Sequence, residues 1–441
     1  MTTSGRNSQA TPNATYTRPV ASATKTYPRG TGTYAGVSFR SSLLRAQQNR
    51  SLVLPKVTTT MVLPVRSSTS RLASASDLAL DPITSQAEDG FAQMARVVPS
   101  SVAGARAPAR GVSGLARSTE VNPLGPASRP NAIGRPMALS EFPRPEGDNG
   151  RGMHWIPTTR SSDDVVDRFV REAKEMKIKW MVILNDDAKI GENDYLVKQL
   201  VANGIMPIMR IYTPNGRPIQ GDLEKLVTHY RQLGVFYYQL YNEPNLNVEN
   251  PDGVPNVDRY LDKWIPAARA VVSAGGLPGF GSLAPGGNFD DIEFLKQAFD
   301  KVKQRGEVPL LDSAWLSMHN YTLNHPLDYA KDSNGFLKFK WYDAIVREKL
   351  GRQMPIIGTE GGTHIGSADD KTMPPIDQAR QIEMVTGAYR YMKKREPYNF
   401  VYTYWIIANE EGGGADSAFS HQALFKRDGR SPLVDALKKL E

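Results

Sequence analysis

The chain has 441 residues, which is more than one average domain but suits one large barrel with an additional segment. It contains no cysteine, so disulfide bonds and thiolate metal sites are excluded. No apolar run approaches the roughly 20 residues that a membrane-spanning helix needs. Residues 1–50 lack the apolar stretch of a secretory signal, so we expect neither a membrane span nor such a signal.

The net charge of +8 is concentrated in the first third of the chain. Residues 1–147 hold 17 Lys and Arg against 7 Asp and Glu, whereas the remainder holds 37 against 39. This first third is rich in Ser, Thr, Ala, Pro, Gly and Arg, and its apolar residues rarely keep a regular period. Such a composition predicts a low-complexity, largely disordered arm or leader over residues 1–147.

Two other interpretations of this arm stay open. Its many Arg side chains would suit an anionic surface or a protein partner. Residues 1–50 also contain basic residues, many Ser and Thr, and no acid, as organelle transit peptides do. A nucleic-acid partner would depend on the arm alone and is not expected.

From residue 148 to residue 441, short apolar runs alternate with helical patterns, which is typical of repeated β-α units. We expect strands at 152–156, 180–184, 206–212, 235–243, 279–283, 314–318, 355–359 and 400–405. We expect helices after Ser161 or Ser162 and at 194–202, 223–233, 257–274, 290–304, 337–350, 376–394 and 433–440. Eight strands and eight helices predict a (β/α)₈ barrel, the TIM-barrel fold, over residues 148–441.

Two glutamates stand at the ends of predicted strands. Glu243 closes an aromatic and aliphatic run, and Pro244 after it cannot donate to a sheet ladder. Glu360 follows the run 355–359. Because the carboxyl ends of all barrel strands open on one face, the catalytic face, we expect these two side chains to face each other. Cleavage of a glycosidic bond with retention takes two carboxyl groups about 5 to 5.5 Å apart. The sequence therefore predicts Glu243 and Glu360 as a catalytic pair.

The motifs Asn242-Glu243-Pro244-Asn245 and His319-Asn320-Tyr321, with the late Glu360 and Trp405, resemble those of the clan A glycoside hydrolases. These are retaining enzymes built on the (β/α)₈ barrel, and the resemblance covers the strand ends from Trp155 to Trp405. It implies Glu243 as acid/base and Glu360 as nucleophile. It further implies Asn242 at the sugar 2-hydroxyl, His319 and Tyr321 beside the nucleophile, and Trp405 as an aromatic floor under the sugar.

Three further positions carry predictions. Trp155, at the end of the first strand, is a candidate for substrate contact, and its neighbour His154 is a sugar-contacting or core residue. Arg210 on the third strand either pairs with Glu360 and keeps it ionised or makes an ordinary salt bridge inside the barrel. The end of the second strand departs from the resemblance, because these enzymes often have an Arg where this chain has Asn185-Asp186-Asp187.

Two other classes of protein compete with this interpretation. A metal-dependent barrel hydrolase would want paired His on its first strand, where this chain has His154 alone, so we expect no metal and no cofactor. Asp186, Asp187 and His364 are too scattered to make a cage. The other alternative is a non-catalytic carbohydrate-binding or structural barrel, attached through its arm to an envelope or phage-like assembly. Such a module has no need of both Glu243 and Glu360.

A carbohydrate is the partner that the sequence favours. Four loops at the predicted carboxyl face are long and polar, which suits a cleft for an oligo- or polysaccharide. These are residues 245–256, 322–335, 363–375 and 409–420. The sugar, the linkage and the choice between endo and exo cleavage stay open.

Overall fold

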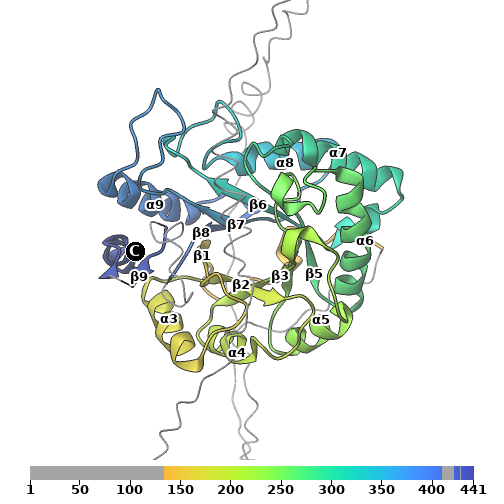
Figure 1. Ribbon diagram of the computed structural model, residues 1–441, viewed down its shortest axis with the longest axis horizontal. Helices are drawn as coiled ribbons and strands as arrows, with labels where there is room; N and C mark the ends of the chain where they lie inside the picture. Colours follow the sequence, from red (N-terminus) through yellow and green to blue (C-terminus); the bar gives the residue numbers. More distant parts are fainter. Residues whose placement is uncertain (1–133, 410–421, 428) are drawn as a thin grey trace, which may run out of the picture. The chain divides into compact units, whose positions relative to one another are not determined.

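Eight parallel strands close into one barrel in the computed structural model, which describes residues 134–409, 422–427 and 429–441 (Figure 1). Neighbours along the chain are neighbours in the sheet, and β1 pairs with both β2 and β8. The strands are β1 (Arg151–His154), β2 (Trp180–Asp186), β3 (Met206–Tyr212), β4 (Tyr237–Leu240), β5 (Leu277–Leu283), β6 (Trp315–Tyr321), β7 (Ile356–Gly362) and β8 (Asn399–Tyr404). The predicted (β/α)₈ barrel is confirmed, whereas the prediction for residues 1–133 lies outside the described residues.

Helices connect the strands and surround the barrel (Figure 1). They are α3 (Asp163–Glu175), α4 (Asp194–Ala202), α5 (Leu223–Gln232), α6 (Val257–Ser273), α7 (Asp291–Gln304), α8 (Lys338–Leu350), α9 (Gln378–Met392) and α11 (Leu433–Lys439). Four of them begin at a side chain that accepts the backbone N–H three residues on, namely Asp222, Asn256, Asp290 and Asp377. Among the described residues, no helix has the length and apolar character to cross a membrane.

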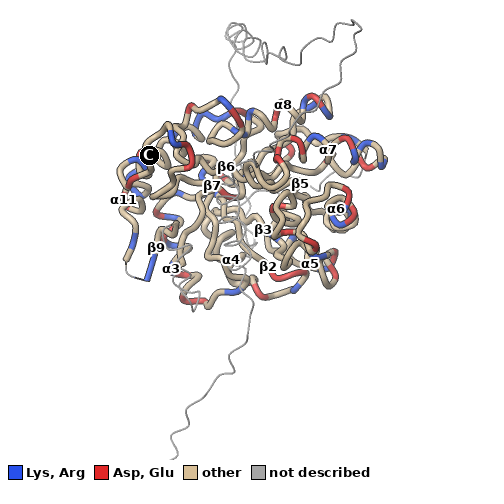
Figure 2. Tube along the Cα trace, turned by 45° about the horizontal axis from the view of Figure 1, so that its top comes forward, with Lys and Arg blue, Asp and Glu red and all other residues tan. Residues whose placement is uncertain are grey.

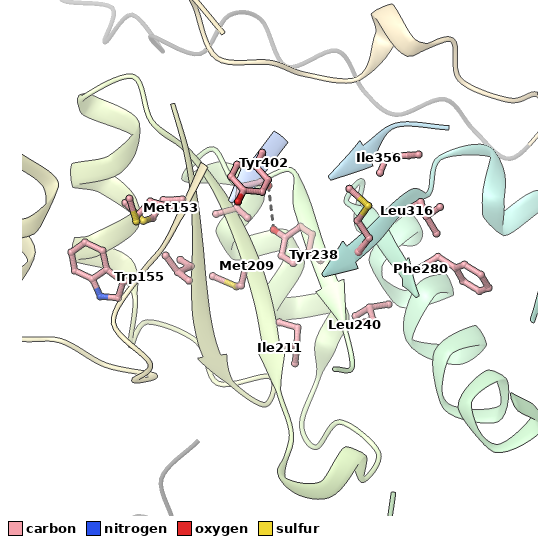
Figure 3. Packing of buried hydrophobic residues seen from close by; sticks show 14 of the residues in the cluster. Met153, Trp155, Met209, Ile211, Tyr238, Leu240, Phe280, Leu316, Ile356 and Tyr402 are labelled. Carbon is pink, nitrogen blue, oxygen red and sulfur yellow. Dashed lines mark hydrogen bonds between the residues drawn. The ribbon is translucent and has the colours of Figure 1, made fainter. Parts of the chain in front are cut away.

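The barrel buries two apolar layers because successive side chains of a strand face opposite sides. The outer layer lies between strands and helices and includes Met209, Tyr238 and Phe280 (Figure 3). The inner layer fills the barrel and includes Trp180 and Trp315. Charged residues lie mostly on the outer helices and loops (Figure 2).

Strand β5 has a glycine at position 279 because the large side chain of Trp315, on the neighbouring strand β6, lies against it. A Cβ on Gly279 would lie 2.6 Å from the Trp315 ring, closer than real contacts allow. The indole of Trp315 occupies the space inside the barrel that a side chain at position 279 would need. The glycines of β5 weaken the strand pattern in the sequence, and β5 begins at Leu277, two residues before its predicted start.

The packed part of the chain begins before residue 148. Met137 and Phe142 are buried in the inner layer, and the Tyr237 hydroxyl donates to the Pro143 carbonyl at 2.6 Å. The Phe142 ring meets Phe400 edge to face, with 6.3 Å between centroids. A short, proline-rich segment with two isolated apolar residues has no period that would reveal this packing in the sequence. Residues 137–147 therefore differ from the arm in which the sequence analysis placed them.

We expect Phe142→Ala to lower the free energy of unfolding by about 3 to 5 kcal/mol, as truncation of a buried Phe generally does. Leu139→Ala is the matched control, since Leu139 is only partly buried against the same layer. Urea denaturation of both variants measures the difference. Equal stabilities for the two variants would contradict the contribution of buried Phe142 to the stability of the barrel.

Candidate active site

Two glutamate side chains meet at the carboxyl end of the barrel. Glu243 lies three residues beyond the end of β4, and Glu360 lies within β7. One oxygen of each carboxyl and a ring nitrogen of His319 all lie within 4.8 Å of one another. Glu243 is 4% exposed, while Glu360 and His319 are fully buried. The structure thus brings together two carboxyl groups that are far apart in the sequence.

A bulge in the sheet aims Glu360 into the barrel. Thr359 faces the interior, where its hydroxyl lies 2.8 Å from that of Ser317, so regular alternation would turn Glu360 outward. The pairing of β6 with β7 shifts between Met318 and His319, and beyond the shift His319 pairs with Glu360. An extra residue of this kind re-aims the side chain that follows it. Two successive residues of β7 therefore face inward.

Three side chains surround the Glu360 carboxylate. Arg210 donates from Nη1 to Oε1 at 2.5 Å, and the Tyr321 hydroxyl donates to Oε2 at 2.8 Å. His319 Nδ1 lies 3.6 Å from Oε2. Burial raises the pKa of Glu360, while His319, Arg210 and Tyr321 act in the opposite direction. Of the two roles considered for Arg210, the structure shows the direct pair with Glu360.

Glu243 is held in a less common backbone conformation. Its φ is 38°, and that of Tyr241 is 63°, so β4 ends at Leu240 and not at Glu243 as the sequence analysis expected. The Glu243 N–H donates to the Ser282 carbonyl at 2.9 Å, which ties the turn to β5. A non-glycine residue in this region costs about 1 to 3 kcal/mol and persists only where its surroundings hold it.

The environment of Glu243 favours its protonated form. A hydrogen bond of 2.9 Å joins Oε1 to His319 Nδ1. Burial raises the pKa of Glu243 to about 7, although Arg210 and Lys338 act in the opposite direction. Burial also lowers the pKa of His319 to about 4, so its ring is neutral at neutral pH. Because Arg210 and Tyr321 donate to Glu360 and not to Glu243, a proton shared by the two carboxyls is better placed on Glu243.

His154 rather than Trp155 faces the interior of the barrel. The Trp155 ring packs in the outer layer against Phe169, with 6.2 Å between centroids, and its Nε1 donates to Ser161 at 3.1 Å (Figure 3). The His154 ring instead lies 4.2 Å from the Trp405 ring. Alternation along β1 sends these two neighbours to opposite faces. The structure therefore places Trp155, the predicted substrate-contacting residue, in the outer layer, and its neighbour His154 is the residue that faces inward.

Trp405 follows β8 and is buried beside Tyr321, in a small apolar cluster that also contains Ile406 and Ala423. The peptide bond between Trp405 and Ile406 is cis. Trp405 thus shares a cluster with Tyr321, the residue that donates to Glu360. The predicted residues Arg210, His319 and Tyr321 lie around Glu360 together, and Trp405 lies in the cluster of Tyr321.

Asn242 contacts a third buried carboxyl group that the sequence analysis did not predict. Its Nδ2 donates to Glu249 Oε1 at 3.2 Å. Glu249 ends the short 3₁₀ helix η3 (Asn247–Glu249) and is 5% exposed. Burial raises the pKa of Glu249 to about 7, and the charge of Glu243 acts in the same direction. A single acid in an irregular loop gives no pattern in the sequence, and its closeness to Asn242 along the chain was the sole signal.

The polar residues at the end of β2 make hydrogen bonds and an ion pair within the surrounding loops. Asp187 pairs through both oxygens with Arg217, at 2.9 and 2.5 Å, and Asn185 donates to the carbonyls of Asp187 and Lys189. His364 lies elsewhere, with its ring 5.7 Å from that of Tyr321. These residues do not converge on a common point.

Within the described part of the chain, one group has carboxylate and imidazole atoms close enough for a metal ion, namely Glu243, His319 and Glu360. Arg210 already donates to Glu360 there, so a metal ion would compete with a guanidinium charge. The donor set suits proton transfer and attack by a carboxylate better than it suits a cation.

A cavity of about 200 Å³ lies away from these residues. Among its lining residues are Gln381, Tyr404 and Lys426, from α9, β8 and β9 (Phe425–Lys426). Strand β9 pairs antiparallel with β10 (Gly429–Arg430) before the last helix, with residue 428 outside the described residues. Glu243, His319 and Glu360 do not line this cavity, whereas Ala423, from the cluster of Tyr321 and Trp405, does.

Comparisons with known proteins give structural similarities of low sequence identity. No family model matches the sequence, and no curated protein matches it. A monomeric beta-xylosidase from Caulobacter crescentus CB15 is similar with a TM-score of 0.47 and 16% identity, over 67% of this chain and 69% of that one. A GH39 beta-xylosidase from Caulobacter crescentus gives 0.46 and 16%, over 67% and 71%. Beta-glucuronidase 2 from Bacteroides uniformis gives 0.42 and 16%, over 66% and 35%.

Proposed function

We propose that this chain is a retaining glycoside hydrolase. Glu360 attacks the anomeric carbon while Glu243 gives its proton to the leaving oxygen, so the glycosidic bond breaks and a glycosyl-enzyme forms. Water then attacks the same carbon, Glu243 takes the proton of that water, and the bond to Glu360 breaks. The two inversions leave the product with the configuration of the substrate.

The observation that carries this proposal is the spacing of the two carboxyl groups. One oxygen of Glu243 and one of Glu360 lie within 4.8 Å of each other. Retaining enzymes have their carboxyl groups about 5 to 5.5 Å apart, whereas inverting enzymes keep about 6.5 to 9.5 Å to admit a water molecule. The short spacing therefore favours direct attack by a carboxylate over attack by water from the opposite side.

The surroundings of each carboxyl group fit its proposed role. Glu360 receives hydrogen bonds from Arg210 and Tyr321, which favour the ionised nucleophile. Glu243 has a pKa raised to about 7 by burial, as a general acid at neutral pH needs. When the glycosyl-enzyme forms, the charge on Glu360 is lost, so the pKa of Glu243 falls and it becomes able to act as a base.

We propose an oligo- or polysaccharide as the substrate. In this proposal Asn242, next to the acid/base, contacts a hydroxyl group of the sugar, and the C–H groups of the sugar stack on the ring of Trp405. His154 lies against Trp405 and replaces Trp155 as the candidate for contact from β1. A carbohydrate-binding module without activity would not need two buried carboxyl groups in contact with one imidazole.

The pKa of Glu243 gives an expected pH dependence. Because Glu243 must hold a proton for the first step, kcat/KM should decrease as the pH rises through about 7. Well below that pH nearly every Glu243 holds its proton and the enzyme is active, and above it this protonated form is lost. Initial rates on an aryl glycoside, with the melting temperature followed over the same pH range, measure this. A rate that stays constant to well above this pH on a stable enzyme would contradict the role of Glu243.

The experiment that tests the proposed function is product stereochemistry. A panel of nitrophenyl glycosides and polysaccharides first identifies a substrate, and proton NMR of the fresh reaction then gives the configuration of the first-formed sugar. We expect the configuration of the substrate. An inverted product, or no turnover of any glycoside by the folded protein, would overturn the proposal.

A further inference from the structure

The loop after β4 holds a buried carboxyl group that the proposed reaction does not use. Glu249 accepts a hydrogen bond from Asn242 Nδ2 at 3.2 Å, and Asn242 directly precedes Glu243 in the chain. Glu249 lies among Glu243, Arg210, Lys263 and the phenol of Tyr212. A carboxyl group that only stabilised a loop would be expected at the surface, where its charge is solvated.

The loop is built to hold Glu249 in place. Asn250 donates to the carbonyls of Pro244 and Leu246 at 2.9 and 2.7 Å, which closes the turn around η3. On its other side, the Glu249 carbonyl approaches the loop after β3 so closely that a Cβ at Gly216 would lie 2.3 Å from the carbonyl oxygen. Gly216 has a φ of 59°, so both the contact and the conformation require glycine there.

The contact with Glu249 fixes which way the Asn242 amide faces. The amide presents its NH₂ group to Glu249 Oε1, so its carbonyl oxygen faces away from that carboxyl group. Asn242 Oδ1 is buried and has no hydrogen-bond partner among the residues that the structure describes. Buried acceptors are generally satisfied, so Oδ1 is available to accept a hydrogen bond from a ligand.

We propose that Glu249 is a positioning residue, which orients the Asn242 amide so that Oδ1 accepts a hydrogen bond from the hydroxyl group next to the anomeric carbon of the substrate. The inference rests on the proposed function. A contact of this kind strengthens as positive charge develops at the anomeric carbon, so it acts on kcat more than on KM. The two carboxyl groups also oppose each other's ionisation, so the charge that Glu249 carries when it is ionised extends the active, protonated form of Glu243 to higher pH.

Two variants separate the roles of the hydrogen bond and of the charge. Glu249→Gln keeps an acceptor for Asn242 Nδ2 and loses the charge, whereas Glu249→Met removes both at similar volume. The exposed residue Glu293 provides the control Glu293→Gln, since its side chain contacts Gln297 on the surface of α7. Circular dichroism and melting temperatures establish that each variant is folded.

The test compares an aryl glycoside with its 2-deoxy analogue. On the full substrate we expect Glu249→Met to lose about 10-fold or more in kcat and Glu249→Gln to stay within about 3-fold of the wild type. On the 2-deoxy analogue the difference between the two variants should disappear. Both variants should move the decrease of kcat/KM to lower pH.

The outcomes distinguish this inference from the function on which it rests. If the wild type turns over glycosides and both variants keep its rate and pH profile, the inference is wrong and the proposed function stands. Equal losses on the two substrates, with lower melting temperatures, would likewise overturn it, because they would mean a structural role alone. If the folded wild type and the Glu293→Gln control turn over no glycoside, the proposed function fails and this inference with it.

Discussion

Replacing Glu360 by Gln is expected to abolish turnover, with a loss in kcat on the order of 10⁴-fold or more, as removal of a covalent nucleophile generally gives. The amide cannot form the glycosyl-enzyme, and it leaves Arg210 without the carboxylate to which its Nη1 donates at 2.5 Å. The loss should be equally large for an activated aryl glycoside, because a good leaving group does not replace a nucleophile. Initial rates on both an activated and an unactivated substrate measure this.

Stability has to be followed in the same experiment. Removing one partner of a buried ion pair costs roughly 3 to 5 kcal/mol, so Glu360→Gln is compared with the wild type by thermal unfolding. Glu360→Asp supplies a second variant, since it keeps the charge near Arg210 but withdraws the carboxylate by one methylene. We expect this variant to be folded and still strongly impaired. Normal turnover by either folded variant would contradict the role of Glu360.

Replacing Glu243 by Ala is expected to reduce kcat/KM about 10²- to 10⁴-fold on substrates with poor leaving groups, the usual contribution of general acid catalysis. On a dinitrophenyl glycoside the first step needs no proton, so kcat/KM should decrease much less there. The second step still lacks its base, and the glycosyl-enzyme should accumulate. Burst kinetics on the dinitrophenyl glycoside measure this difference between the two steps.

Azide provides the control for Glu243→Ala. It is a nucleophile that needs no base and fits the space left by the side chain, so it should restore turnover and give a glycosyl azide with the configuration of the substrate. Azide should not accelerate the wild type, in which Glu243 already activates water. Failure of rescue in the folded variant, or equal losses on good and poor leaving groups, would contradict the assignment of Glu243 as the acid/base.

The order of the elements could be predicted from the sequence because each strand and helix has its own local pattern. Strand β3 and helix α4 have the predicted bounds, at Met206–Tyr212 and Asp194–Ala202. Apolar runs, helix caps and glycines at helix ends are properties of neighbouring residues, and the closed barrel follows from their repetition. The packing of residues 137–147 was missed because Met137 and Phe142 belong to no such pattern.

The direction in which an individual side chain points could not be predicted in the same way. Glu360 faces the interior because the register of β6 and β7 shifts at Met318, and a register shift is a property of two strands and not of one. His154 and Trp155 are adjacent, and the face that each takes depends on how β1 is set against its neighbours. Glu249 reaches Asn242 through the fold of a loop, for which the sequence offers only proximity.

The protonation states of the site could likewise be predicted only in part from the sequence. The resemblance implied that Glu243 is the acid/base, and burial raises its pKa to about 7. The sequence did not indicate a third carboxyl group beside this pair, although the pKa of Glu249 is raised by burial to a similar value. Coupled acids of this kind titrate together, so the pH profile reports on all of them.

The most direct test of the proposed mechanism is to find the residue that carries the sugar. A 2-deoxy-2-fluoro glycoside with a good leaving group, built on the sugar that the wild type accepts, slows both steps and traps the glycosyl-enzyme; mass spectrometry of the digested protein then locates the label. We expect one sugar per chain, attached to the peptide that contains Glu360 and absent from Glu360→Gln. A label on another residue, or full turnover without any trapped intermediate, would contradict attack by Glu360.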